Sequence, residues 1–82
     1  MASYSVSITE EAAAELGEVP FPFRRQINQR IMKLKANPRP DAAIRTSEKA
    51  ERYRLETSGW ALLYEVDESE LRVTVTEIIR AV

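Results

Sequence analysis

The sequence predicts an α+β domain, in which two N-terminal-half helices pack on one face of a small, mostly antiparallel four-stranded sheet, in the order β-α-α-β-β-β. Apolar and polar residues alternate near the start of the chain and again through its second half, whereas two segments between them have helical periodicity. The length of 82 residues suits one compact domain, residues 1–82, with a single core.

The first expected elements are a strand and a short helix. Apolar residues alternate with serines over residues 4–8, which predicts a strand with one buried face. Thr9, or Ser7 through a capping box, is a candidate N-cap for the helix that follows, and Gly17 is expected to end it.

A longer second helix is predicted after the proline-containing turn at residues 20–22. Pro22 fits its first turn, and Asn37-Pro38 is expected to stop it. Its apolar side recurs at spacings of four, four and three, at Phe23, Ile27, Ile31 and Leu34.

The second half of the chain predicts a meander. Residues 38–49 are expected to form a loop, with room for a short strand near Ile44, and three strands follow at residues 52–56, 60–66 and 71–79. Alternation places Tyr53, Leu62, Tyr64 and Val75 among the residues that face the helices. The opposite, open face is expected to carry Arg52, Arg54, Glu56, Ala61, Leu63, Glu65, Arg72, Thr74, Thr76 and Arg80.

Composition excludes several kinds of chemistry. The chain has no cysteine and no histidine, so it has no disulfide, thiol nucleophile or imidazole base, and we expect no cofactor and no metal. No apolar run approaches the roughly 20 residues that a membrane helix needs, and the start does not resemble a signal peptide. We therefore expect a cytoplasmic protein without a membrane partner.

Charge is segregated along the chain. Residues 1–23 carry a net charge of −4, residues 24–54 a net charge of +7 and residues 55–82 a net charge of −4. The basic middle can form a surface patch for a polyanion, or it can be a solvated helix face.

In order and spacing these elements resemble the RelE/ParE toxins, which are ribosome-dependent mRNA endonucleases and gyrase poisons encoded beside an antitoxin. The resemblance covers nearly the whole chain, although no single motif is specific. It rests on Tyr4-Ser5-Val6, on Ala13 and Leu16, on Ile27, Ile31 and Leu34 before Asn37-Pro38, on Tyr53-Arg54-Leu55 and on Gly59-Trp60-Ala61-Leu62-Leu63-Tyr64-Glu65-Val66.

The resemblance implies a cluster of basic residues on the open face. Guanidinium groups there would meet the charge that builds on a phosphate when a ribose 2′-hydroxyl attacks it. The catalytic positions would be Arg52, Arg54 and Arg80. We further expect Arg45, Lys49 and Arg72 to bind RNA.

Three departures from the family pattern predict an incomplete active site. Ala61 stands where the family usually has an arginine, and Glu56 places negative charge beside the expected RNA site. The sequence ends at Val82, without the tyrosine that RelE-type nucleases use near their C-terminus. Glu56 or Glu65 is a candidate general base, although exposed strand carboxylates are more often plain solvated residues.

Two functions therefore stay open. One is a RelE-like toxin of a type II toxin–antitoxin system that cleaves mRNA at the ribosome, or an attenuated relative of one. The other is a non-catalytic member, either a ParE-like gyrase inhibitor or a protein-binding module. For both functions we expect a cognate antitoxin protein as partner, and the first also requires the ribosome and mRNA.

Overall fold

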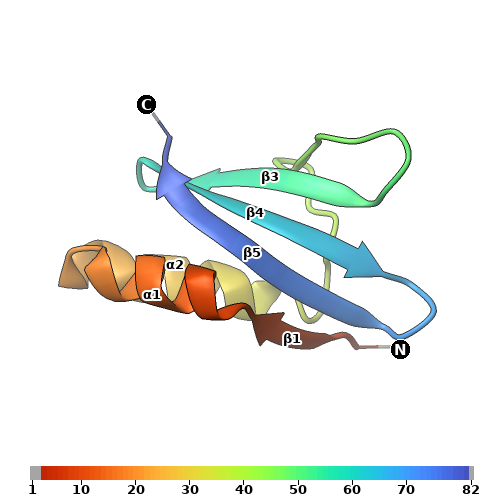
Figure 1. Ribbon diagram of the computed structural model, residues 1–82, viewed down its shortest axis with the longest axis horizontal. Coiled ribbons are helices and arrows are strands. Elements are labelled where there is room, and N and C mark those ends of the chain that lie inside the picture. Colours follow the sequence, from red (N-terminus) through yellow and green to blue (C-terminus); the bar gives the residue numbers. More distant parts are fainter. Residues whose placement is uncertain (1–2, 82) are drawn as a thin grey trace.

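The computed structural model describes residues 3–81, and it confirms the predicted α+β class (Figure 1). Two helices cover one face of a sheet with the strand order β1-β5-β4-β3-β2. The sheet has five strands rather than four, because the short strand near Ile44 pairs with the strand after it. The elements are β1 (Ser5–Ile8), α1 (Glu10–Glu18), α2 (Phe21–Lys33), β2 (Ile44–Arg45), β3 (Arg52–Thr57), β4 (Trp60–Asp67) and β5 (Arg72–Arg80).

The sheet is mixed. β1 runs parallel to β5, whereas β5, β4, β3 and β2 form antiparallel pairs. The β3–β4 hairpin turns through Ser58 and Gly59, which have φ angles of 55° and 83°. A two-residue turn with positive φ at both residues has a backbone twist that matches the twist of the two strands it joins.

The first helix begins where the sequence predicts and ends later. The Thr9 side chain accepts a hydrogen bond from the backbone N–H of Ala12 at 3.1 Å, which identifies Thr9 rather than Ser7 as the N-cap. Gly17 does not end the helix, which continues through Glu18. The helix stops there because Val19 precedes a proline and is extended, with φ −71° and ψ 134°.

The core lies between the helices and the sheet. The predicted helix-facing residues of β3, β4 and β5 are buried, apart from the half-buried Trp60, together with Ile27, Ile31 and Leu34 of α2. The predicted buried face of β1 is only partly formed, because Val6 is half-buried and Ile8 is 38% exposed. Phe23, at the start of the predicted α2 stripe, remains 41% exposed. Tyr64 lies at the centre: its ring stacks on Tyr53 with centroids 5.5 Å apart.

A β-bulge interrupts the pairing of β4 with β5. Leu63 pairs with Glu77, but the next residue, Tyr64, pairs with Val75. Thr76 is therefore the extra residue of β5, and its hydroxyl donates to the Leu63 carbonyl at 3.1 Å. Every side chain of β5 beyond Thr76 consequently lies on the opposite face from the one that uninterrupted alternation predicts.

Helix α1 contacts this bulge directly. The Thr9 hydroxyl donates to the Thr76 carbonyl at 3.3 Å, and the Ile78 backbone N–H donates to Glu15 Oε1 at 2.9 Å. β1 ends before this point, so α1 satisfies backbone groups that a neighbouring strand would otherwise pair.

Candidate functional site

The open face of the sheet is built from four cross-strand rows. Because paired residues share a face, the register fixes which side chains are neighbours. From one end of the face to the other the rows are Ser5–Arg72–Asp67, Ser7–Thr74–Glu65–Arg52, Glu77–Leu63–Arg54–Ile44 and Ile79–Ala61–Glu56.

Two of the three predicted catalytic arginines come together on this face. Arg52 and Arg54 lie on β3 in adjacent rows, where alternation of the strand places both side chains outward. Each has a carboxylate partner: Arg52 Nε lies 3.5 Å from Glu65 Oε1, and Arg54 Nη2 lies 3.3 Å from Glu56 Oε2. These pairs are largely exposed to solvent and contribute little to stability.

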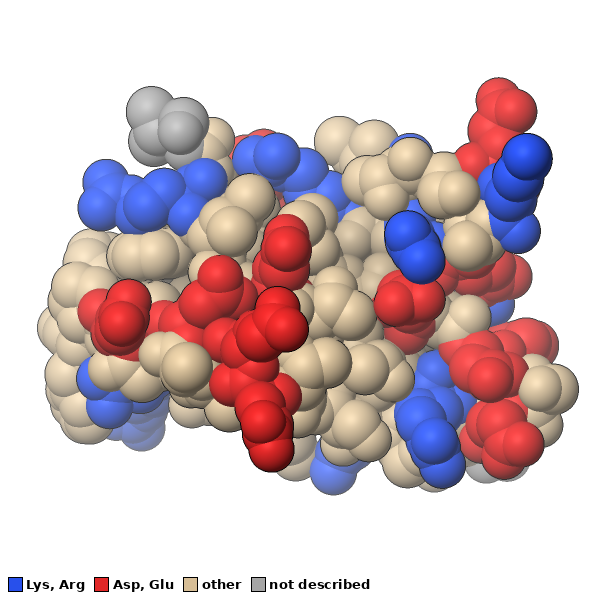
Figure 2. Space-filling view, viewed as in Figure 1, with Lys and Arg blue, Asp and Glu red and all other residues tan. Residues whose placement is uncertain are grey.

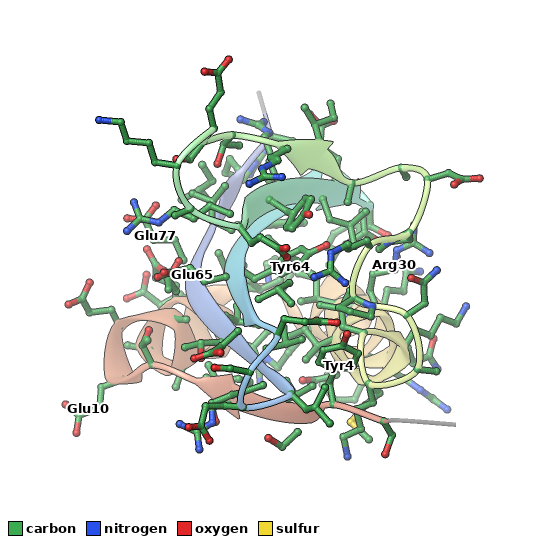
Figure 3. All side chains as sticks on the ribbon, turned by 90° about the vertical axis from the view of Figure 1, so that its right-hand side faces the viewer. Tyr4, Glu10, Arg30, Tyr64, Glu65 and Glu77 are labelled. Carbon is green, nitrogen blue, oxygen red and sulfur yellow. The ribbon has the colours of Figure 1, made fainter. Side chains whose placement is uncertain are left out.

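Beside Arg52 the face is hollowed into a cavity of about 350 Å³. Glu65 and Glu77 both line it, and Figure 3 shows their side chains on the same side of the sheet, away from Tyr64 and Arg30. Thr46 and Leu63 also line this cavity. The cavity thus combines a guanidinium group, hydroxyl groups and two carboxylates.

The expectation that Arg80 lies on the open face is wrong. Arg80 pairs with Trp60, a residue of the helix-facing row, and its guanidinium carbon lies 5.2 Å from the centre of the Trp60 ring. The bulge at Thr76 causes the difference, because one extra residue reverses the alternation. The bulge therefore separates Arg80 from Arg52 and Arg54.

The three predicted RNA-binding residues do not form one cluster. Arg72 shares the open face and pairs across the sheet with Asp67. Arg45 pairs with Tyr53, whose side chain belongs to the core side, and its Nε donates to the Ser47 carbonyl at 2.8 Å. Lys49 is exposed in the loop between β2 and β3.

Glu77 is an open-face residue beside the cavity that sequence reasoning missed. Regular alternation from Val73 and Val75 places it toward the helices, and the bulge at Thr76 returns it to the open side. Ala61 does lie on the open face as predicted, but it is fully buried beneath its neighbours. A substitution with a longer side chain at Ala61 would have to displace them.

The open face is not a basic patch. Its rows contain three arginines and four carboxylates, and two of the arginines are paired with glutamates. Acidic side chains also gather over α1, which carries four glutamates and no basic residue (Figure 2). The densest positive charge lies instead in residues 21–35, where five lysines and arginines occur without an acid.

Chemically, this face can hold a phosphate against two guanidinium groups and can accept a proton on a carboxylate. Within residues 3–81 no group of three or more aspartate or glutamate side chains is arranged to hold a metal ion. In the same part of the chain, no helix is long and apolar enough to cross a membrane.

No protein-family model matches the sequence, and no curated protein matches it by sequence. Solved structures do match the fold. The RelBE2 toxin–antitoxin complex from Mycobacterium tuberculosis contains a chain with a TM-score of 0.83 and 18% identity, covering 96% of this chain and 99% of that one. The archaeal RelE–RelB complex from Pyrococcus horikoshii OT3 gives a TM-score of 0.84 at 15% identity, covering 96% of each chain.

The isolated Escherichia coli RelE toxin matches with a TM-score of 0.78 and 23% identity, over 98% of this chain and 86% of that one. The structure therefore has the fold of the RelE toxins. This confirms the resemblance found in the sequence at the level of the fold, whereas fold alone does not assign an activity.

Proposed function

We propose that this protein is the RelE-like toxin component of a type II toxin–antitoxin module, acting on translated mRNA at the ribosome with attenuated cleavage. The single observation that supports it most is the placement of Arg52 and Arg54 in adjacent rows of the open face of a RelE fold. The proposed site of action is the cytoplasm, and the proposed partner is an antitoxin, because several of the matching structures are toxin–antitoxin complexes.

The proposed chemistry uses the 2′-hydroxyl of the RNA as nucleophile: its attack forms a 2′,3′-cyclic phosphate, the P–O5′ bond breaks, and the 5′-oxygen leaves with a proton taken from water. Arg52 and Arg54 would hold the scissile phosphate and stabilise the charge that develops on its oxygens. Arginine stays protonated at neutral pH and cannot accept the proton, so we assign that role to a carboxylate. Glu65 is the best placed, since it borders the cavity beside Arg52.

Attenuation follows from the same contacts. A phosphate can reach Arg52 or Arg54 only in competition with Glu65 or Glu56, whose negative charge also repels RNA. Ala61 supplies no cation, and Arg80 lies on the far face.

The balanced charge of the open face favours a second candidate function, a non-catalytic toxin-like protein that inhibits a protein target. A ParE-like gyrase inhibitor and a simple protein-binding module both belong to this class. Neither needs a phosphate site, so Arg52 and Arg54 would then be ordinary solvated residues.

Induced expression in a bacterium, with growth curves and mapping of mRNA 5′ ends, distinguishes these functions. A translation extract programmed with one defined message gives the rate of cleavage. We expect the Arg52→Ala/Arg54→Ala variant to cleave at least about tenfold more slowly. Lys35→Ala, which removes a positive charge outside the open face, should cleave at the parental rate.

Growth arrest with new codon-phased 5′ ends supports the nuclease. Arrest with intact message refutes it in favour of a protein target. If the double variant cleaves as fast as the parent, the two arginines are not catalytic.

A further inference from the structure

Within residues 3–81, the Nε of Arg30 is a shielded hydrogen-bond donor without an acceptor. Arg30 is half-buried in α2, whereas the other half-buried arginines, Arg24, Arg39 and Arg54, each contact a carbonyl or carboxylate oxygen. A shielded donor on a charged group lowers stability unless an acceptor satisfies it. The Arg30 guanidinium group therefore needs an acceptor that does not belong to the described part of the chain.

A small pocket lies beside this donor, between α2, the loop that follows it and β3. Its volume is about 180 Å³. Arg30, Lys33 and Asn37 supply its polar groups. The rest of its lining is apolar and consists of Leu34, Pro40 and Leu55. Figure 3 shows Arg30 on the side of the sheet away from Glu65, so this pocket is separate from the cavity on the open face.

The pocket carries positive charge that no carboxylate of the described residues balances. Arg30 and Lys33 are three residues apart in α2, so their side chains lie on the same side of the helix. None of the lining residues is acidic, and within residues 3–81 no carboxylate forms an ion pair with either cation. An anion that enters the pocket therefore meets two unpaired cations.

The size and the walls of the pocket restrict the kind of anion. Pockets for drug-sized ligands have volumes of about 300–1,000 Å³, so this one fits a smaller molecule. Leu34 and Leu55 can bury an apolar group, which an inorganic ion does not have. A phosphate dianion also loses more hydration than a singly charged carboxylate when it enters apolar surroundings. A carboxylate with a short aliphatic chain is therefore the best fit.

We propose that this pocket binds a small aliphatic carboxylate. Its two oxygens accept hydrogen bonds from the Nε and one Nη of Arg30, in the bidentate geometry that guanidinium and carboxylate groups favour. Lys33 adds a second positive charge, and the aliphatic chain packs on Leu34 and Leu55. The inference does not depend on the proposed function, because no residue assigned to RNA cleavage lines this pocket and its test uses no RNA.

Nuclear magnetic resonance measures the proposed contact directly. A shielded guanidinium N–H exchanges slowly with water and gives its own nitrogen–proton signal, which the Arg30→Lys variant lacks and so identifies. Titration with butyrate should shift the Arg30 Nε–H signal to a plateau. Butyramide, which has the same chain without the charge, and inorganic phosphate should each bind at least about tenfold more weakly.

Variants, compared through their backbone amide shifts, locate the ligand. Arg30→Met keeps the apolar stem of the side chain and removes its donors, so we expect at least about tenfold weaker butyrate binding and a Tm no lower than that of the parent. Lys33→Met, at an exposed position where substitution does not endanger the fold, should weaken butyrate binding severalfold. Lys35→Met is the matched control, because Lys35 is exposed and does not line the pocket, and it should bind butyrate as the parent does.

Four results overturn the inference. An Arg30 Nε–H signal that does not move with butyrate would mean that water satisfies this donor. Equal affinities for butyrate and butyramide would mean that the pocket does not recognise charge. Inorganic phosphate that binds as tightly as butyrate, or more tightly, would make this a phosphate site. Unchanged butyrate binding by Arg30→Met or Lys33→Met would place the ligand elsewhere.

Discussion

The hydroxyl group of Tyr64 provides the sharpest test of the core. Tyr64 is 1% exposed, and its hydroxyl donates to the carbonyl of Pro38 at 2.7 Å, while Pro38 itself is buried. This bond ties the centre of the sheet to the loop that follows α2. The Tyr64→Phe substitution removes the donor and leaves the ring in place.

The expected cost comes from the acceptor that remains. A buried carbonyl without a partner costs about 1–3 kcal/mol, more than the net value of an ordinary hydrogen bond. In a domain of this size each kcal/mol lowers Tm by about 4–8 °C. Tyr64→Phe should therefore melt several degrees below the parent at pH 7.

Alkaline pH gives an independent signature of the same group. Burial raises the pKa of Tyr64 to about 12, from its ordinary value of 10.0. Between these values the unfolded chain loses the proton while the folded chain keeps it, so the free energy of unfolding falls as pH rises through this window. The slope at its steepest is about 1.4 kcal/mol per pH unit for one group.

Urea denaturation of the parent and of Tyr64→Phe from pH 7 to pH 12 measures both effects. The variant should be less stable at pH 7 and should lack this part of the alkaline decline. Tyr4→Phe is the control, because the Tyr4 hydroxyl bonds to Glu68 at the surface, and it should lose less stability. Equal stability of Tyr64→Phe and the parent at pH 7 would refute the account.

Two further predictions concern the local structure. Thr9→Ala removes the N-cap of α1 and a contact with the bulge, and it should cost about 0.5–2 kcal/mol in urea denaturation; no loss would mean that the cap is dispensable. Gly17→Ala should stabilise the helix by roughly 0.5–1 kcal/mol because nothing lies within 4 Å of an added Cβ, whereas Gly59→Ala should destabilise by about 1 kcal/mol at its φ of 83°. Calorimetry of the two glycine variants tests these roles. A shift of Tm in the same direction for Gly17→Ala and Gly59→Ala would contradict them.

Local patterns were enough to predict the elements and most of the core. Alternation identified β3 and β4, and helical spacing identified the buried side of α2, because each of these signals depends on residues that are close in sequence. The extension of α1 past Gly17 was missed, since a glycine is tolerated inside a helix when the following Val19-Pro20 supplies the stop.

The bulge at Thr76 could not be predicted, and it changed the candidate site most. Its support comes from Thr9 and Glu15, more than sixty residues away in the chain, so no window around β5 contains the signal. The bulge is the reason why Arg80 lies on the helix-facing side and Glu77 on the open face, each opposite to the prediction.

The basic middle of the sequence failed as a guide to the site because the fold distributes it over different surfaces. Arg24 caps α1, Arg39 pairs with Glu51 and Glu68, and Arg52 and Arg54 have carboxylate partners. The free positive charge that remains on α2 lies behind the sheet, on the layer opposite the open face (Figure 1).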